Sequence, residues 1–382
     1  MHKHTRVEIA DIFSAEAHRF LNSDGYTQVQ KKAYMDIINC RTAALGGHEQ
    51  VCDDCSAVRY AYNSCRNRCC PKCQFIKKAK WVDKLSSNLP RVKYFHLVFT
   101  IPDCLHTLFY INQRLAYHLL FQAAGQALKQ CAGNTNYLGA QAGAVAILHT
   151  WGQTLVYHPH VHMMVPAGGL SEDQTEWIPS HKQFFLPVKV LSMVFRGILW
   201  RSIEQAVRAG KMVLPGQIKS IELLKSNCYS KKWVVYSEKP FASPHNLVNY
   251  LGNYTHRVAI SNQRLLAHQN GKVTFFYKDN RKGGLGSRMT LERGEFIQRF
   301  LRHVLPAGFS KIRYFGFMAL RYLQANVAQC ALLLNKAMFL PALEGLNAME
   351  VMRQLSGKDP QRCPKCGRGM LHPRLHKAPE TG

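Results

Sequence analysis

Apolar residues recur at helical spacing along several stretches of the chain. Ile9, Ile12 and Phe13 follow this spacing near the start, and Tyr34 and Ile37 follow it after a turn-like run of polar residues. The same spacing predicts helices over residues 105–131, 187–209, 295–305 and 317–340.

Other stretches alternate or run continuously apolar, as β-strands do. Residues 91–102 form one such run, which ends at a proline, and residues 272–278 alternate apolar and polar side chains. Residues 143–149 and 155–166 have the pattern of two strands joined by a short turn, which predicts a β-hairpin. A short strand is predicted at residues 233–236. Helices and strands are therefore mixed along the chain, as in an α+β protein.

Lysine and arginine outnumber aspartate and glutamate by 50 to 23, which gives a formal net charge of +27. Such a charge attracts polyanions, and nucleic acid is favoured because each neutralised phosphate releases a condensed counterion. A membrane surface would also be attracted. However, no stretch reaches about 18 uninterrupted apolar residues, and the N-terminus has no apolar leader segment. The sequence therefore predicts a cytoplasmic protein that binds nucleic acid and no membrane.

Six of the 13 cysteines lie in three Cys-x2-Cys pairs, which favours zinc sites over disulfides. Cys52-x2-Cys55 and Cys70-x2-Cys73 are separated by fourteen residues, close to the spacing of a four-cysteine zinc ribbon. Such a zinc is structural, because four protein ligands leave no open coordination position. Further candidate ligands nearby are Cys40, His48, Cys65 and Cys69. The resulting eight groups would satisfy two zinc ions; the alternative is one zinc and four ordinary thiols.

The C-terminal tail has the pattern Cys363-x2-Cys366-x5-His372-x3-His376, which predicts a small zinc knuckle. The alternative is a disordered basic tail. Basic residues interleave with the N-terminal cysteines, so that module is expected to present a cationic face to phosphates. The candidate DNA contacts there are Arg66, Arg68, Lys77 and Lys78.

A different kind of metal site is predicted on the second strand of the hairpin. His160 and His162 are two residues apart, so their imidazoles point to the same face of the strand and can share one divalent ion. A catalytic metal of this kind keeps a position open for substrate. A metallo-β-lactamase-like hydrolase also uses His-x-His, but its pattern continues with Asp-His, whereas Met163 and Met164 follow here.

Several residues are candidates for the third ligand of this metal ion. His149 is preferred because it lies on the preceding strand, across from the His-x-His pair. Gln153 and Asp103 are alternatives, and Asp103 is the only carboxylate between residues 101 and 170. His158 would alternate onto the same face, although Pro159 makes its direction uncertain.

Two tyrosines supply candidate nucleophiles. Ser243-Pro244 provides an N-cap and a first-turn proline for a helix that carries Tyr250 and Tyr254 on one face, four residues apart. The phenol pKa is near 10, so a nearby cation is needed to help attack on a phosphate. Attack would give a 5′-phosphotyrosine and a free 3′-hydroxyl. The alternatives are that one tyrosine attacks while the other stacks on a base, or that both pack in the core.

The segment around these tyrosines is cationic. Residues 240–278 contain no Asp or Glu but include Arg257 and Arg264, and Arg313 follows further along the chain; these three arginines are additional candidate DNA contacts. The sequence has no Gly-x-x-x-x-Gly-Lys-Ser/Thr loop for ATP. The protein would therefore depend on DNA that is already single-stranded or has been opened by other proteins.

Five motifs together resemble one family. Residues 62–73, 96–102, 149–153, 158–162 and 250–257 are similar, in order, to motifs of the two-tyrosine HUH transposases of rolling-circle insertion sequences, the IS91 type. The resemblance covers about residues 8 to 320. It implies an N-terminal helical and zinc-ribbon domain and an HUH nuclease domain with a central antiparallel sheet flanked by helices. It also implies single-strand transposition that nicks at one end of the element and resolves at the other.

The resemblance makes His160 and His162 ligands of Mg²⁺ or Mn²⁺, and Tyr250 and Tyr254 the nucleophiles. The expected partners are single-stranded DNA, hairpins at the element ends, target DNA, and host replication or helicase functions. One departure is Cys69, which stands where the family has histidine before the Cys-Pro-Lys-Cys run. The expected domains are residues 1–90 (zinc-binding), 91–320 (nuclease), 321–357 (a helical extension) and 358–382 (the C-terminal knuckle).

Two other functions compete with this prediction. A rolling-circle replication initiator or a relaxase would use the same histidine, metal and tyrosine chemistry, although relaxases usually place the tyrosine before the histidines. A non-catalytic zinc-finger DNA-binding protein would need the charge and the cysteines, but neither the His-x-His pair nor the tyrosines.

Overall fold

A computed structural model describes residues 7–181, 185–238, 241, 247–248, 252, 259–279 and 283–374. Contacts between residues divide the chain into two compact units. The first unit joins three separate stretches, Met1–Lys80, His256–Val304 and Ala342–Gly382, and the second joins Trp81–Thr255 and Leu305–Pro341. This division does not follow chain order, whereas the boundaries predicted from the sequence do. Those boundaries remain a prediction.

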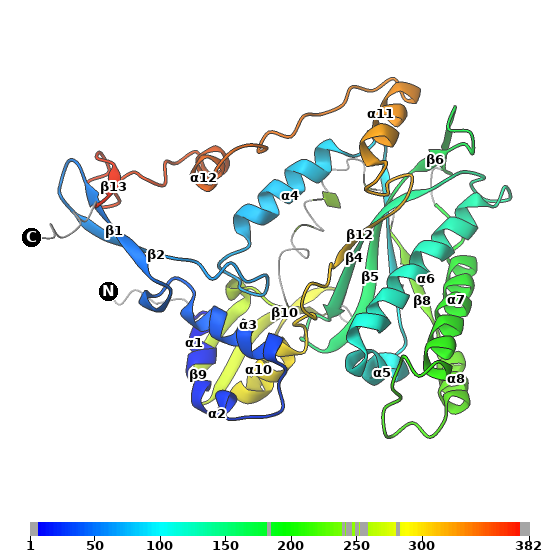
Figure 1. Ribbon diagram of the computed structural model, residues 1–382, viewed down its shortest axis with the longest axis horizontal. Helices are drawn as coiled ribbons and strands as arrows, with labels where there is room; N and C mark the ends of the chain where they lie inside the picture. The colour runs from blue at the N-terminus through cyan, green and yellow to red at the C-terminus, as the bar shows by residue number, and fades with distance from the viewer. Residues whose placement is uncertain are drawn as a thin grey trace, which may run out of the picture. The chain divides into compact units, whose positions relative to one another are not determined.

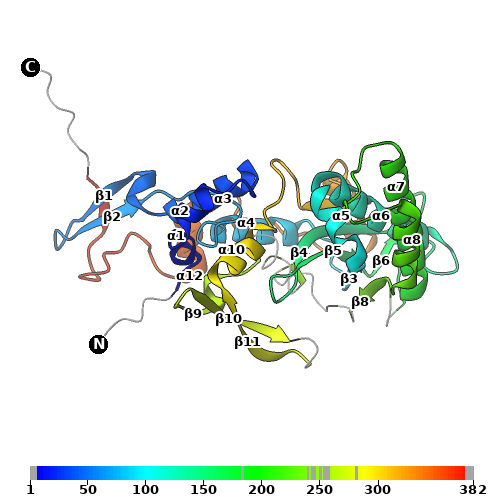
Figure 2. The same cartoon turned by 90° about the horizontal axis from the view of Figure 1, so that it is seen from below.

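The first unit has a helical part that packs on a three-stranded sheet. Phe13 lies at its centre, with its ring 4.6 Å from that of Tyr34 and 5.3 Å from that of Phe300. Figures 1 and 2 both show α10 beside the N-terminal helices and the sheet. The sheet order is β11-β10-β9, and the strands are antiparallel. The elements are α1 (Ile9–Ser14), α2 (Ala17–Leu21), α3 (Gln28–Asn39), η3 (Asn262–Arg264), β9 (Leu265–Gln269), β10 (Lys272–Asp279), β11 (Leu285–Glu292) and α10 (Arg293–Leu301).

A second small sheet in the first unit pairs a strand from the C-terminal part of the chain with a hairpin from the N-terminal part. Its order is β13-β1-β2, so the C-terminal strand pairs with the N-terminal hairpin (Figure 1). Before this strand lies an amphipathic helix that begins with an Asn347 capping box and ends at Gly357, whose φ is 66°. The elements are η1 (Ala43–Leu45), β1 (Gly47–Cys52), β2 (Val58–Tyr62), α12 (Ala348–Ser356) and β13 (Leu371–Pro373).

The second unit is built on a five-stranded sheet of order β12-β4-β5-β3-β8. Every neighbouring pair is antiparallel. The predicted α+β class, the antiparallel sheet and the hairpin of β4 and β5 are thus confirmed. The strands are β3 (Tyr94–Thr100), β4 (Gly143–Trp151), β5 (Tyr157–Pro166), β8 (Val234–Ser237) and β12 (Ile312–Gly316), and a separate hairpin consists of β6 (Gly168–Leu170) and β7 (Trp177–Pro179).

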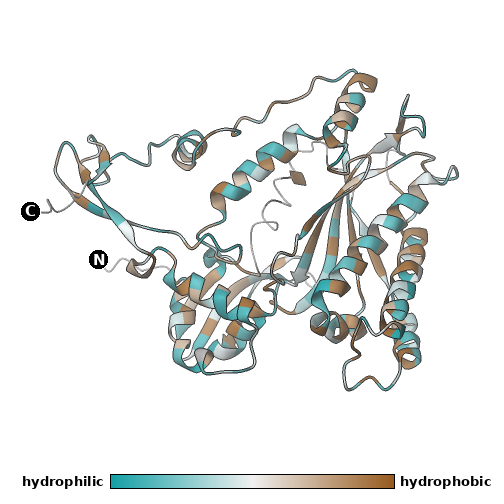
Figure 3. Ribbon diagram, viewed as in Figure 1, coloured by the Kyte–Doolittle hydropathy of each residue, from teal (hydrophilic) through white to brown (hydrophobic). Residues whose placement is uncertain are grey.

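Helices cover one face of this sheet and bury its larger core. Phe95, Leu97 and Phe99 of β3 pack there with residues of α6 and α7, such as Phe121 and Phe195. Figure 3 shows hydrophobic stretches, in brown, along the strands of this sheet. The helices of this layer are η2 (Asp103–Leu105), α5 (His106–Ile111), α6 (Gln113–Gly133), α7 (Val188–Arg208) and α8 (Ile221–Ser230).

The opposite face of the sheet has a second core. Ile147 and Met164 pack there with the C-terminal half of α4 (Phe75–Ser87) and with α11 (Leu323–Leu333). The helix predicted over residues 317–340 is shorter in the structure: it begins at Leu323, and Asn335, with φ 48°, follows its C-terminal end. Among the described residues, no helix is both long and apolar enough to cross a membrane.

Candidate functional site

The hairpin of β4 and β5 brings three imidazoles together. His149 of β4 lies opposite His160 of β5 in the strand register, and Ile147 lies opposite His162. One ring nitrogen from each histidine falls in a group whose members all lie within 4.8 Å of one another. This is the set that the sequence favoured, with His149 as the third member.

The histidines lie on the sheet face away from α6 and α7. Val161 and Met163 of β5 point into the larger core, so His160, His162 and Met164 point to the other side. The same alternation places His149 beside Val145 and Ile147 of β4. The face that carries the imidazoles is therefore the one that packs against α11 and the end of α4.

Burial keeps these imidazoles neutral. It lowers the pKa of His149 and of His162 well below the ordinary value, with neighbouring histidines adding to the effect. Burial, assisted by the charge of His158, lowers the pKa of His160 to about 3. A neutral imidazole offers a lone pair, which is the form that binds a metal ion. The three side chains could therefore hold a cation without first losing protons.

Hydrogen bonds fix which ring nitrogen carries the lone pair in His162 and in His160. Glu238 Oε2 lies 2.9 Å from His96 Nδ1, and His96 Nε2 lies 2.7 Å from His162 Nδ1. The hydrogen bond from His96 lowers the pKa of Glu238, so the carboxylate accepts and His96 Nδ1 donates. His96 Nε2 then accepts from His162 Nδ1, and His162 keeps its lone pair on Nε2.

His160 has the same arrangement. Its Nδ1 lies 2.6 Å from the His158 carbonyl oxygen and donates to it, which leaves Nε2 with the lone pair. Sequence reasoning gave no role to Glu238 or His96. The signal in the sequence was the position of His96. It lies on β3, the strand that pairs with β5, and shares a strand face with Tyr94.

The other candidate ligands have different surroundings. Asp103 is exposed and pairs with Lys231, with 3.0 Å between Oδ1 and Nζ. His158 lies against His106, with ring centroids 5.4 Å apart, and Gln153 is half-buried in the turn between β4 and β5. Of the acidic residues that the structure describes, none joins the histidine group.

Tyr250, Tyr254 and Arg257 lie outside the described residues. Just before them, Leu247 and Val248 are helical and fully buried. Both belong to the second core, with Ile147 and Met164, the strand neighbours of the histidines. The segment that leads to the tyrosines is thus anchored on the histidine face.

The cysteines form two four-sulfur groups in the first unit. Cys40, Cys65, Cys70 and Cys73 make one, with the Cys73 sulfur 3.2 Å from that of Cys40 and 3.6 Å from that of Cys65. The other group is Cys52, Cys55, Cys363 and Cys366.

This pairing differs from the ribbon predicted from spacing, in which Cys52 and Cys55 would join Cys70 and Cys73. The reason is the length of the hairpin: Cys52 and Cys55 lie at its tip, and Cys65 follows its base. The five residues of β2 separate tip from base by roughly 17 Å at about 3.4 Å per residue. The tip therefore meets the C-terminal pair instead.

Four further predicted zinc ligands lie outside these groups or outside the described residues. His48 is exposed on β1, opposite Ala61. The Cys69 amide donates to Asn67 Oδ1 at 2.8 Å. His372 Nε2 lies 3.2 Å from Asp53 Oδ2. His376 is not among the described residues.

The predicted DNA contacts have varied environments. Arg66 and Lys77 are exposed, whereas Arg68 and Lys78 are half-buried. Arg264 donates from Nε to the Phe276 carbonyl oxygen at 2.7 Å. Arg313 lies over the ring of Phe121, 4.6 Å from its centroid, and donates to His118 Nδ1 at 2.9 Å. Arg66 and Lys77 thus leave their charges most open to a phosphate.

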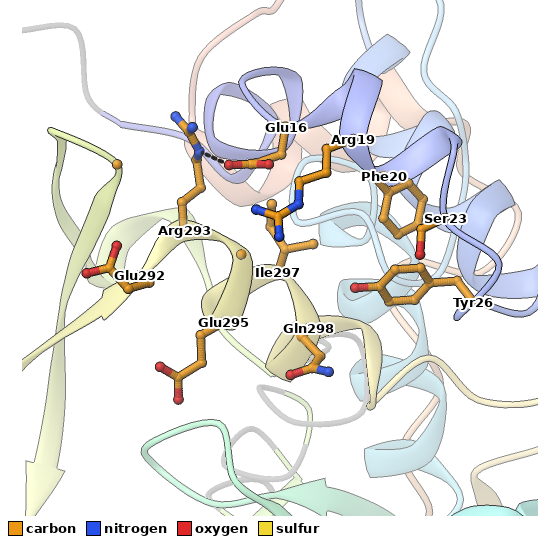
Figure 4. A pocket seen from close by; sticks show the side chains of 12 residues that line it. Glu16, Arg19, Phe20, Ser23, Tyr26, Glu292, Arg293, Glu295, Ile297 and Gln298 are labelled. Atoms are coloured by element: carbon orange, nitrogen blue, oxygen red, sulfur yellow. Dashed lines mark hydrogen bonds and ion pairs between the residues drawn. The ribbon is translucent and has the colours of Figure 1, made fainter.

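The first unit also has a hollow of about 690 Å³ between α2 and α10. Figure 4 shows that Arg19 and Arg293 line it together with Glu16, Glu292 and Glu295, and Arg293 Nε pairs with Glu16 Oε1 at 2.8 Å. Because charges of both signs face this hollow, it has no clear preference for an anion or a cation.

Comparison with known proteins decides the family. A family model described as "Transposase zinc-binding domain" matches residues 12–101, and one described as "Putative transposase" matches residues 143–326. The "Putative transposase y4qJ" of Sinorhizobium fredii is 42% identical over an alignment of 378 residues, which covers 95% of this chain and 94% of that protein. The "Transposase for insertion sequence element IS801" of Pseudomonas savastanoi pv. phaseolicola is 30% identical over 95% of this chain and 88% of that protein. The chain belongs to the IS91 family of transposases.

The transposase therefore acts on DNA and belongs to a class of DNA-cleaving enzymes. The zinc-binding match contains six of the eight grouped cysteines and ends before Cys363 and Cys366. The second match contains His149, His160 and His162, as well as the positions of Tyr250 and Tyr254. No solved structure matches this transposase.

Proposed function

We propose that this transposase cuts and rejoins single-stranded DNA through 5′-phosphotyrosine intermediates, in rolling-circle transposition of its insertion sequence. The main support is one arrangement on the sheet of the second unit. Three neutral imidazoles converge on a face against which Leu247 and Val248 also pack, and Tyr250 follows two residues later.

His149, His160 and His162 would hold Mg²⁺ or Mn²⁺. Their donor set fits a catalytic ion, because each neutral ring offers a nitrogen and three protein ligands leave coordination positions open. These positions would take oxygen atoms of water and of the scissile phosphate. When bound, the ion offsets the phosphate charge and favours attack on phosphorus. Glu238 and His96 would keep His162 oriented toward it.

Tyr250 and Tyr254 would be the nucleophiles. A phenol oxygen forms a bond to phosphorus, the bond from phosphorus to the 3′-oxygen breaks, the phenol loses its proton and the leaving 3′-oxygen gains one. The 5′ end is then attached to tyrosine. In the reverse step a 3′-hydroxyl attacks the phosphotyrosine and releases the phenol. One phosphodiester replaces another, so the strand is rejoined without ATP.

Two tyrosines allow two strand transfers in one site, with one phenol holding the donor end while the other attacks. The substrates would be single-stranded DNA, hairpins at the element ends and target DNA, with strand opening supplied by host replication or helicase functions. A zinc at Cys40, Cys65, Cys70 and Cys73 would stabilise the DNA-binding shape of the first unit. The proposed DNA contacts are Arg66, Arg68, Lys77, Lys78, Arg257, Arg264 and Arg313.

The test uses the full chain and single-stranded oligonucleotides from the ends of its own element. A covalent protein–DNA adduct should appear with Mn²⁺ or Mg²⁺, and it should disappear with EDTA. The double variant Tyr250→Phe/Tyr254→Phe should form no adduct but still shift the oligonucleotide in a gel. An adduct formed by this double variant, or one that persists in EDTA, would refute the proposal. Equal binding without any adduct from the unmodified protein would favour a non-catalytic DNA-binding role.

A further inference from the structure

We propose that Cys52, Cys55, Cys363 and Cys366 bind a structural zinc that joins the C-terminal segment to the N-terminal hairpin. The four sulfurs lie within 4.8 Å of one another, with 3.8 Å between Cys52 and Cys366 and 3.7 Å between Cys55 and Cys363. Tetrahedral zinc at about 2.3 Å from each sulfur holds the sulfurs about 3.8 Å apart, whereas a disulfide needs about 2.05 Å. The spacing is that of a metal site.

The two cysteine pairs are presented by matching turns. The Ser56 amide donates to the Cys52 carbonyl oxygen at 3.1 Å, and the Gly367 amide donates to the Cys363 carbonyl oxygen at 2.9 Å. In each turn the residue after the second cysteine is left-handed, with φ 53° at Ser56 and 70° at Gly367. Two separate parts of the chain thus form the same knuckle, and the knuckles face each other.

Backbone contacts stabilise the thiolate form of Cys366 and allow the two knuckles to approach closely. The Gly369 amide lies 3.3 Å from the Cys366 sulfur and donates to it. A Cβ on Gly369 would lie 2.5 Å from the Cys52 sulfur, so only glycine fits between the two knuckles. On binding, the four thiols would release their protons to solvent and leave four thiolates on the zinc.

Asp53 ties the strands that flank the site. Its carboxylate accepts from the Met370 amide at 2.8 Å, and its amide donates to the Met370 carbonyl oxygen at 3.1 Å. His372 pairs with the same carboxylate, at 3.2 Å, and thereby supports this strand connection. In this arrangement His372 is not a zinc ligand, contrary to the knuckle predicted for the tail alone.

The β13-β1-β2 sheet and its two knuckles bury little apolar surface. Its apolar cluster holds Cys52, Cys363 and Leu371 as buried members, packed with Ala57. So small a core is typical of domains that need a metal or disulfides. Cys363 and Cys366 lie beyond both regions matched by the family models, so the site completes the zinc-binding region with residues from outside it.

Zinc content of the full chain tests the pairing. The double variants Cys52→Ser/Cys55→Ser and Cys363→Ser/Cys366→Ser should each bind one zinc fewer than the unmodified protein. The quadruple variant should also bind only one fewer, because both pairs serve the same ion. Cys69→Ser, adjacent to Cys70 but outside both groups, is the matched control and should lose none, as should His372→Ala. Loss of two zinc ions in the quadruple variant would overturn the proposal.

A second measurement needs no variant and so does not depend on folding. The unmodified protein is titrated with a chelator, pulsed with N-ethylmaleimide and digested for peptide mass spectrometry. Cys52, Cys55, Cys363 and Cys366 should lose protection together, at one chelator concentration. Alkylation of Cys363 and Cys366 while Cys52 and Cys55 stay protected would show two separate sites and refute the shared one. Neither experiment depends on nuclease activity.

Discussion

His96 Nε2 lies 2.7 Å from His162 Nδ1, across the pairing of β3 with β5. The two rings are nearly parallel, with centroids 4.9 Å apart and planes inclined by 12°. Both side chains are buried, and Glu238 accepts from the other nitrogen of His96. The orientation of His162 is therefore set by a residue that does not itself belong to the group of three imidazoles.

Removing this support should weaken metal binding more than it weakens folding. We expect His96→Ala and Glu238→Ala to lower the apparent Mn²⁺ affinity by about 10–100-fold, as for other partners of metal-bound histidines. Glu238→Gln should lose less, because its amide oxygen can still accept from His96. The measurement is adduct formation as a function of Mn²⁺ concentration, with excess Mn²⁺ restoring activity.

Asp103→Asn provides the control for this series, since Asp103 is exposed and pairs with Lys231. It should leave the Mn²⁺ dependence unchanged. If His96→Ala lowered the thermal stability but left the half-saturating Mn²⁺ concentration unchanged, a positioning role for His96 would be excluded.

The identity of the third ligand leads to a separate prediction. His149→Ala should abolish metal-dependent adduct formation, because two imidazoles alone give a poorly held ion. Gln153→Ala and Asp103→Asn should remain close to the unmodified protein. Direct binding of Mn²⁺, followed by its electron paramagnetic resonance signal, separates loss of the ion from loss of a later step. Full Mn²⁺ binding by His149→Ala would remove it from the ligand set.

The histidine group could be predicted from the sequence because it depends on residues close together in the chain. Strand alternation sets the direction of His160 and His162, and a short hairpin brings the neighbouring strand, with His149, alongside. These rules place His149 across from the His-x-His pair, and its pairing with His160 also depends on a register shift between His149 and Trp151. Glu238 could not be predicted in this way, because it lies 142 residues after His96 and is brought to it by the pairing of β8 with β3.

The cysteines show the opposite case. A Cys-x2-Cys pair has the same sequence whichever second pair completes its zinc site. Spacing along the chain therefore favoured the nearest second pair. The observed partner of Cys52 and Cys55 lies more than 300 residues away, as the 314-residue separation of Cys52 and Cys366 shows. The pairing of β13 with β1 decides which cysteine pair joins Cys52 and Cys55, and no sequence pattern near either strand predicts that pairing.

Single tyrosine variants should separate attack from stacking. Phenylalanine keeps the aromatic ring and removes the phenol oxygen, so a tyrosine that only stacks on a base should tolerate the change. If both are nucleophiles, Tyr250→Phe and Tyr254→Phe should each still form an adduct with a single end, and each should fail to join two ends. Adduct formation and joined product are measured on the same oligonucleotides. A variant that retains both products would identify its tyrosine as a stacking residue.

Gly316 ends β12, next to the strand that carries His149, and it should be intolerant of a side chain. Its φ is 58°, and a Cβ there would lie 1.7 Å from the Ala142 carbonyl oxygen. Gly308 has a similar φ of 67° but open space around it, so Gly308→Ala isolates the backbone cost, about 1–2 kcal/mol. Gly316→Ala should cost more, at least about 3 kcal/mol, since the sheet edge must also move. The comparison of thermal unfolding midpoints checks this, and equal midpoints for the two variants would show that β12 yields without strain.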